Sequence, residues 1–149
     1  MSDFHELESW LGGLLLNVEV PARRALARAV AAEMRRRQAK RIAEQRNPDG
    51  SAYEPRKPQL RQRPGRVRRT MFARLRTARF LKAQSDPSAA VVTFVGQVQR
   101  IAAVHHFGLR DRVNKAEVET TYPRRELLGF TEPDATRIAE LITSHIGAL

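Results

Sequence analysis

Residues 47–65 contain four prolines and several arginines, and this stretch limits the fold more than any other; the prolines are Pro48, Pro55, Pro58 and Pro64. Proline lacks a backbone N–H and has a fixed φ, so neither a long helix nor a central strand can continue through it. The stretch also has little apolar surface to offset the entropy lost on ordering. We therefore predict a mobile Pro/Arg-rich loop over residues 47–65, within a single domain of residues 1–149.

Two helical patterns precede this loop. Residues 3–16 place Phe4, Leu7 and Leu11 at helical spacing. Residues 21–46 predict a long basic helix, which begins at a proline that suits the first helical position. Its apolar residues follow a four-residue spacing that Gln38 interrupts; they are Leu26, Val30, Met34 and Ile42. Asn47, Pro48, Asp49 and Gly50 are turn residues that should end this helix.

The second half of the chain mixes helical and extended patterns. Residues 66–84 have helical periodicity, residues 89–95 are the best strand, and residues 116–122 alternate as a second strand. Residues 98–107 fit either a helix or a strand. Thr131 and Asp134 form a variant of the capping box before an amphipathic C-terminal helix, residues 131–147. The order predicts an α+β fold, with helices 21–46 and 131–147 around a small sheet that includes strand 89–95.

Positive charge is concentrated in one part of the chain. Residues 23–82 hold 20 Lys/Arg and 4 Asp/Glu, a net charge of +16, whereas the other residues hold 7 basic and 12 acidic residues, a net charge of −5. Such asymmetry indicates a polyanionic partner or an acidic protein surface, although a solvated basic face would look the same. On the predicted helix 66–84, four arginines share one side and form the main interaction candidate: Arg68, Arg69, Arg76 and Arg79. Arg124 and Arg125 either brace the last helix or face a partner.

The residues that usually perform chemistry are scarce. The sequence has no cysteine, which excludes disulfides, thiolate nucleophiles and Cys-based metal sites. His105 and His106 are adjacent and should point to different sides, so one is expected to be packed or hydrogen-bonded and the other exposed. No Walker loop, G-x-G-x-x-G motif or G-x-S-x-G motif occurs. We therefore predict no catalytic residue, no cofactor and no metal site, and hence no enzyme.

Other classes of partner are less favoured than protein. Arginines could bind the phosphates of a nucleic acid, but zinc-finger spacing, RNA-recognition aromatics and a helix-turn-helix are lacking. No apolar run is long enough to cross a bilayer, and the acidic N-terminus does not resemble a signal peptide. We expect the chain to be made and retained in the cytoplasm and not to bind membranes. A nucleic-acid-binding protein remains the alternative.

Four stretches, in order along nearly the whole chain, resemble the phage virion morphogenesis family, the tail completion proteins of contractile-tailed bacteriophages. They are QRNPDGSAY at residues 45–53, MFARLRTARFLK at 71–82, VHHFGLRD at 104–111 and YPRRELLGF at 122–130. The resemblance implies a structural protein of the virion that acts in tail completion and head–tail joining, at the head-proximal end or neck of the tail. It also implies a homo-oligomeric ring and contacts with other tail and neck proteins. It supplies no catalytic, cofactor or metal residue.

Overall fold

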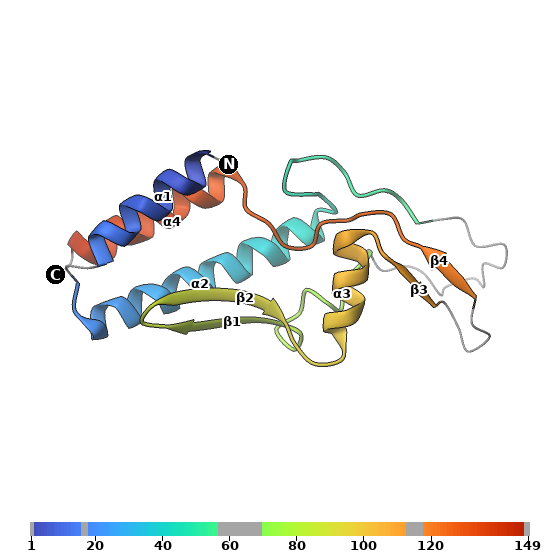
Figure 1. Cartoon of the computed structure of the whole chain (residues 1–149), viewed down its shortest axis with the longest axis horizontal. Coiled ribbons are helices and arrows are strands. Elements are labelled where there is room, and N and C mark those ends of the chain that lie inside the picture. The colour runs from blue at the N-terminus through green and yellow to red at the C-terminus, as the bar shows by residue number, and fades with distance from the viewer. Residues whose placement is uncertain (1, 16–17, 57–69, 113–117, 148–149) are drawn as a thin grey trace. The chain divides into compact units, whose positions relative to one another are not determined.

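The computed structural model describes residues 2–15, 18–56, 70–112 and 118–147 (Figure 1). These residues form four helices and two sheets of two strands each. In chain order the elements are α1 (Ser2–Leu15), α2 (Val20–Ala43), β1 (Leu81–Asp86), β2 (Ala89–Phe94), α3 (Val98–Phe107), β3 (Arg110–Arg112), β4 (Glu119–Thr121) and α4 (Glu132–Gly147). The predicted α+β class is confirmed. The helices predicted over residues 21–46 and 131–147 are also confirmed and correspond to α2 and α4.

The contacts divide the chain into two compact units. The first unit comprises Met1–Arg37, Leu81–Thr93 and Phe130–Leu149, and the second comprises Gln38–Phe80 and Phe94–Gly129. The assignment of a single domain stays a prediction. Within the described part of the chain, no helix has the length and apolar character that a membrane crossing needs.

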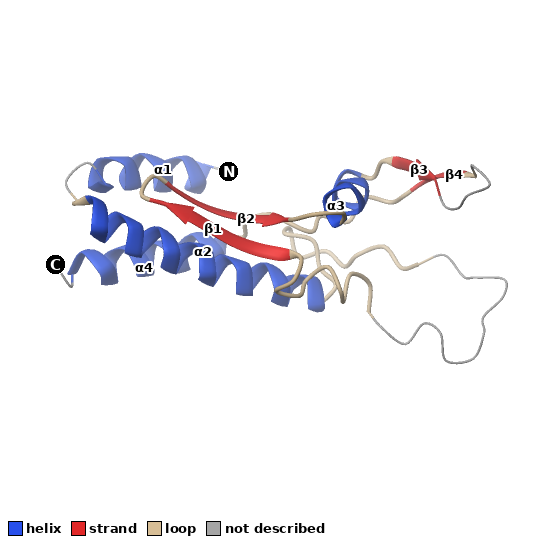
Figure 2. Ribbon diagram, turned by 90° about the horizontal axis from the view of Figure 1, so that it is seen from below, coloured by secondary structure: helices blue, strands red, loops and turns tan. Residues whose placement is uncertain are grey.

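The first unit contains α1, most of α2, the β1–β2 hairpin and α4 (Figure 2). Its buried core is made by the apolar stripes of α2 and α4, and Leu7 and Leu11 of α1 and Val92 of β2 pack against it. The core residues are Leu26, Met34, Ile138 and Ile142. The helical spacing predicted these contacts, since residues three or four apart share one face.

The start of α4 has the predicted capping box. The hydroxyl of Thr131 accepts a hydrogen bond from the backbone N–H of Asp134 at 3.2 Å. In return, Oδ2 of Asp134 accepts one from the backbone N–H of Thr131 at 3.0 Å. Both groups satisfy N–H donors that a helix leaves without intrahelical partners, so they fix where α4 begins.

Helix α2 ends at Ala43, three residues before the predicted end. Gln45 has a φ of 58°, and its N–H donates to the carbonyl of Ile42, while the N–H of Arg46 donates to the carbonyl of Arg41. This pair of bonds is a Schellman motif, which ends a helix with a left-handed residue. The turn predicted at Asn47 follows, with the N–H of Gly50 bonded to the Asn47 carbonyl at 2.9 Å.

The helix predicted over residues 66–84 is wrong. Residues 71–80 form consecutive turns, and Leu81–Asp86 is the strand β1; residues 66–69 lie outside the described residues. Phe72 has a φ of 65°, which a right-handed helix cannot include. The side chain of Gln45 also binds both backbone groups of Met71, at 2.9 and 3.2 Å, and so fixes the turn from elsewhere in the sequence.

The remaining elements follow the sequence more closely. The predicted strand 89–95 is β2, and the ambiguous residues 98–107 form α3. Of the strand predicted over residues 116–122, Glu119–Thr121 forms β4, which pairs antiparallel with β3; residues 116 and 117 are outside the described residues. The predicted loop 47–65 is described only as far as residue 56, and its mobility stays a prediction.

Gly108 and Gly129 lie at boundaries between elements, where a glycine can adopt a positive φ at little cost. Gly108 does so, with a φ of 65°, and forms the left-handed cap of α3. Gly129 does not, because its requirement is space: a Cβ built there would lie 2.4 Å from Cγ of Pro48.

Candidate interaction site

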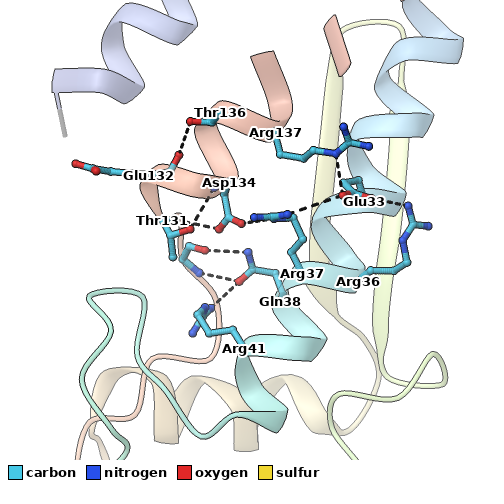
Figure 3. A network of polar contacts seen from close by, with 11 residues as sticks. Glu33, Arg36, Arg37, Gln38, Arg41, Thr131, Glu132, Asp134, Thr136 and Arg137 are labelled. Carbon is cyan, nitrogen blue, oxygen red and sulfur yellow. Dashed lines mark hydrogen bonds and ion pairs between the residues drawn. The ribbon is translucent and has the colours of Figure 1, made fainter. Parts of the chain in front are cut away.

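Several arginines of α2 serve to hold the first unit together (Figure 3). Arg37 donates a hydrogen bond from Nε to the buried carboxylate of Asp134 at 2.6 Å. Glu33 lies between Arg36, at 2.7 Å, and Arg137 of α4, at 3.1 Å, and these hydrogen bonds lower the pKa of Glu33, with that to Arg36 the largest cause. Part of the concentrated positive charge is thus used inside the fold.

In the second unit, Gln38 and Arg41 have a similar structural role (Figure 3). The buried side chain of Gln38 donates to the carbonyl of Gly129 at 2.8 Å and accepts from the N–H of Gly129 at 3.1 Å. Arg41 donates to Gln38 and to the carbonyls of Arg46, Glu126 and Leu127. The sequence contained a signal for this network, because Gln38 occupies a position where the α2 stripe is otherwise apolar.

The structure does not bring the predicted arginine cluster together on a helix. Arg68 and Arg69 lie outside the described residues, and Arg76 and Arg79 lie in the turns of residues 71–80. Arg79 is exposed and stands 5.2 Å above the ring of Phe80. Arg76 is half-buried, and its Nε has no hydrogen-bond partner within the described residues. The role of these four residues in binding stays a prediction.

Arg124 and Arg125 differ sharply in environment. Arg125 is only 5% exposed, and it donates to the carbonyls of Glu54 and Pro55 at 2.7 and 3.2 Å. Arg124 is exposed and pairs with the carboxylate of Glu126. Of the two roles considered for these arginines, Arg125 therefore has the structural one. It stabilises residues 54–55, however, and not the start of α4.

The second unit contains a hollow of about 1420 Å³. Its walls come from residues 54–56, the turns of residues 70–80, α3 and residues 118–125. Apolar side chains form much of the lining: Met71, Phe72, Leu75, Phe80, Val98, Ile101, Val118 and Tyr122. Ile101 is 48% and Val118 56% exposed, which is high for large apolar residues. Exposed apolar side chains that cluster around a concave surface are typical of protein-binding sites.

The charged residues that line the hollow are mostly basic. They are four arginines and two glutamates: Arg56, Arg74, Arg79, Arg125, Glu54 and Glu119. Glu119 is already paired with Arg110 at 2.7 Å. Burial, followed by the charge of Arg125, lowers the pKa of His105 in the wall, and Asp111 acts less strongly in the opposite direction. The hollow thus combines apolar walls with an excess of positive charge.

Aromatic rings form one side of the hollow. The ring of Phe72 lies edge-on to those of Tyr53 and His105, at centroid distances of 5.8 and 5.0 Å, and His105 lies 4.6 Å from Tyr122. Nδ1 of His105 is buried and has no hydrogen-bond partner in the part of the chain that the structure describes. His106 instead accepts a hydrogen bond from the N–H of Leu127 at 3.2 Å. Both histidines are half-buried, so the expectation that one would be exposed is wrong.

The described residues contain no group of three or more His, Cys, Asp or Glu side chains that could hold a metal ion.

The hollow was not predicted from the sequence, because its lining comes from four separate segments. Its chemistry suits noncovalent binding, since apolar walls provide buried area and arginines provide charged donors.

Comparison with known proteins gives the chain a family. A model of the phage virion morphogenesis family matches residues 2–147. The chain is also 40% identical to tail completion protein S of Escherichia phage P2 over 148 residues, which cover 98% of this chain and 99% of the phage P2 protein. No solved structure matches the chain. Both the near-complete family match and the full-length similarity show that this chain belongs to the phage virion morphogenesis family.

Proposed function

We propose that this protein is a structural component that completes the tail of a bacteriophage particle and has no catalytic role. The observation that supports this most directly is the 40% identity, over almost the full length of both chains, to a protein named for tail completion. The similarity spans 98% of this chain and 99% of the phage P2 protein. The proposal therefore concerns the whole chain.

The distribution of side chains supports a role in assembly. Arg37, Arg41 and Arg125 stabilise the fold through specific hydrogen bonds, while the apolar Ile101 and Val118 stay exposed beside a hollow. Exposed apolar surface is costly in water and is commonly covered when a protein assembles. This arrangement fits a protein whose final environment is a particle.

Within the particle, we place the protein at the head-proximal end of a contractile tail, in the neck, where it joins the tail to the head. Proteins there match the rotational symmetry of the tail, so a homo-oligomeric ring is part of the proposal. Its partners would be other tail and neck proteins. These more specific statements rest on the resemblance of the sequence to the phage virion morphogenesis family.

The proposal is tested by deleting the gene from the phage or prophage that carries it. Heads and tails should then form separately, while the yield of infectious particles falls by several orders of magnitude. Electron microscopy of the lysate would show unattached tails, and a plasmid copy of the gene should restore joined particles. A normal infectious yield without the protein would contradict the proposal.

Nucleic-acid binding is the second candidate, favoured by the net charge of +16 in residues 23–82. Binding to duplex DNA releases condensed counterions, so the affinity should fall steeply as salt rises. Mixing the purified protein with unrelated duplexes at 50 and 200 mM salt separates the two candidates. Tight binding with a steep salt dependence would favour this second function.

A further inference from the structure

We propose that the hollow of the second unit is a docking site for an acidic segment of another tail protein, which inserts apolar side chains between α3 and the turns of residues 70–80. This inference rests on the proposed function, since it names the kind of partner that the assembly role requires. It adds a defined site and a defined chemistry to that role.

The size of the hollow favours a stretch of polypeptide as the occupant. Its volume of about 1420 Å³ exceeds the range of roughly 300–1,000 Å³ that is usual for small-molecule sites. Its walls contain Phe72, Leu75, Phe80 and Val98, so one or more apolar side chains of the occupant would lose contact with water there. The exposed Ile101 and Val118 would be covered by the same segment.

The charge of the lining selects an acidic occupant. Arg74 and Arg79 are exposed, and neither forms an ion pair with a carboxylate within the described residues. Arginine binds carboxylates in a paired geometry and tolerates an interface well. In addition, the sequence between Arg56 and Thr70 carries six basic residues and no acidic one. The arginines of the lining would repel these residues, so they complement the hollow less well than an acidic segment from another protein.

The backbone of the wall is unusual in a way that fits a binding site. Phe72 has a φ of 65°, a conformation that is costly for an aromatic residue and that is often found at ligand-binding positions. This conformation brings its ring against Tyr53 and His105.

Nucleic acid fits this site less well than protein. Phosphates would bind the arginines, but they would leave the apolar walls in water. Bases could stack on aromatic rings, yet the rings of Phe72, His105 and Tyr122 already pack against one another. The combination of apolar walls and arginines is the one expected at the centre of a protein–protein interface.

The test uses the full-length chain and two fluorescent peptides of twelve residues. One peptide carries two Leu and one Phe among Glu residues, and its twin carries Gln in place of every Glu. Fluorescence anisotropy should show that the wild-type chain binds the acidic peptide about tenfold more tightly than the twin, a difference of roughly 1.4 kcal/mol. Equal binding of the two peptides would overturn the charge argument.

Variants then locate the site. The exchanges Arg74→Glu with Arg79→Glu should abolish the preference for the acidic peptide, and Ile101→Ser with Val118→Ser should weaken its binding about tenfold. The matched control is Arg24→Glu with Arg28→Glu, which changes the charge equally on two exposed arginines of α2 in the first unit. If the control weakens binding as much as the lining variants, attraction is general and the proposed site is wrong. Circular dichroism and thermal melting confirm that each variant is folded.

A photo-crosslinking residue at position 118 extends the test to assembled tails. It should link to a peptide of another tail protein that is rich in Asp, Glu and apolar residues. Links only within the same chain, to DNA or to basic peptides would each overturn the proposal. If the gene is essential for joining but the lining variants assemble normally, the docking site alone fails. If deletion has no effect on particles, the proposed function itself fails.

Discussion

Nε of Arg37 donates a hydrogen bond to Oδ1 of Asp134 at 2.6 Å, so α2 is tied to the first turn of α4. The other carboxylate oxygen of Asp134 caps α4. Asp134→Ala should therefore lose two interactions and lower the free energy of unfolding by about 2–4 kcal/mol. Urea denaturation measures the change. Thr136→Ala, at an exposed site of the same helix, is the control and should change it by less than about 1 kcal/mol. Equal losses in the two variants would refute this role of Asp134.

Arg124 and Arg125 form a second matched pair. Arg125→Gln should lower the free energy of unfolding by about 2–3 kcal/mol, because the buried guanidinium and its charged hydrogen bonds to the carbonyls of Glu54 and Pro55 are lost. Arg124→Gln should cost no more than about 1 kcal/mol, since its pair with Glu126 is exposed to solvent. Thermal melting of both variants tests this order. A larger loss of stability in Arg124→Gln than in Arg125→Gln would show that solvent exposure does not determine how much each arginine contributes.

Gly129 is predicted to tolerate no side chain. Gly129→Ala would place a methyl group 2.4 Å from Cγ of Pro48, and the resulting overpacking should cost about 1–3 kcal/mol. Gly12→Ala is the control in α1, where a Cβ meets nothing within 4 Å. It should stabilise the helix by about 0.5–1 kcal/mol, because alanine loses less backbone entropy. The melting temperatures of the two variants should thus shift in opposite directions.

The two adjacent histidines predict a loss of stability in mild acid. Burial lowers the pKa of both; the charge of Arg125 lowers that of His105 further, whereas Glu126 opposes the effect at His106. Above the unfolded pKa of about 6.5, both states are neutral and these residues add no pH dependence. Below it the unfolded chain binds protons first, so the free energy of unfolding falls until the pH passes the folded pKa values.

Urea denaturation at pH 7.5 and 5.5 measures this effect. The wild type should lose more stability between these values than the double variant His105→Phe with His106→Asn. The first exchange keeps an aromatic ring, and the second keeps an acceptor near the position of Nδ1. An identical loss in the wild type and the variant would mean that other groups cause the pH dependence.

The local sequence pattern was sufficient to predict those helices that are stabilised by one apolar face or by one capping box. The stripe of Leu26, Val30 and Met34 predicted α2, and Thr131 with Asp134 predicted the start of α4. The helix prediction failed for residues 71–80 because contacts with residues far away in the sequence determine their conformation. The side chain of Gln45 binds Met71 across 26 positions, and no local periodicity records such a bond.

The candidate site was the least predictable feature. The sequence predicts an arginine cluster on one side of a helix, yet residues 71–80, which include Arg76 and Arg79, form turns, and the buried Arg125 donates hydrogen bonds to residues 54–55. Charge counts do not distinguish an arginine that binds a carbonyl inside the fold from one that faces a partner. The hollow requires the folded positions of four segments, so no single motif predicts it.

The β1–β2 hairpin has a consequence for handling the isolated protein. In the described residues its sheet has only two strands, so Ala89, Ala90 and Val91 lie in an edge strand. β2 reads Ala-Ala-Val-Val-Thr-Phe and has no charged residue, whereas β1 carries Lys82 and Asp86. An uncharged, β-prone edge is a template for strands of other copies. Storage at high concentration should therefore produce β-rich aggregates, and a lysine at Val91 would extend the shelf life of the purified chain.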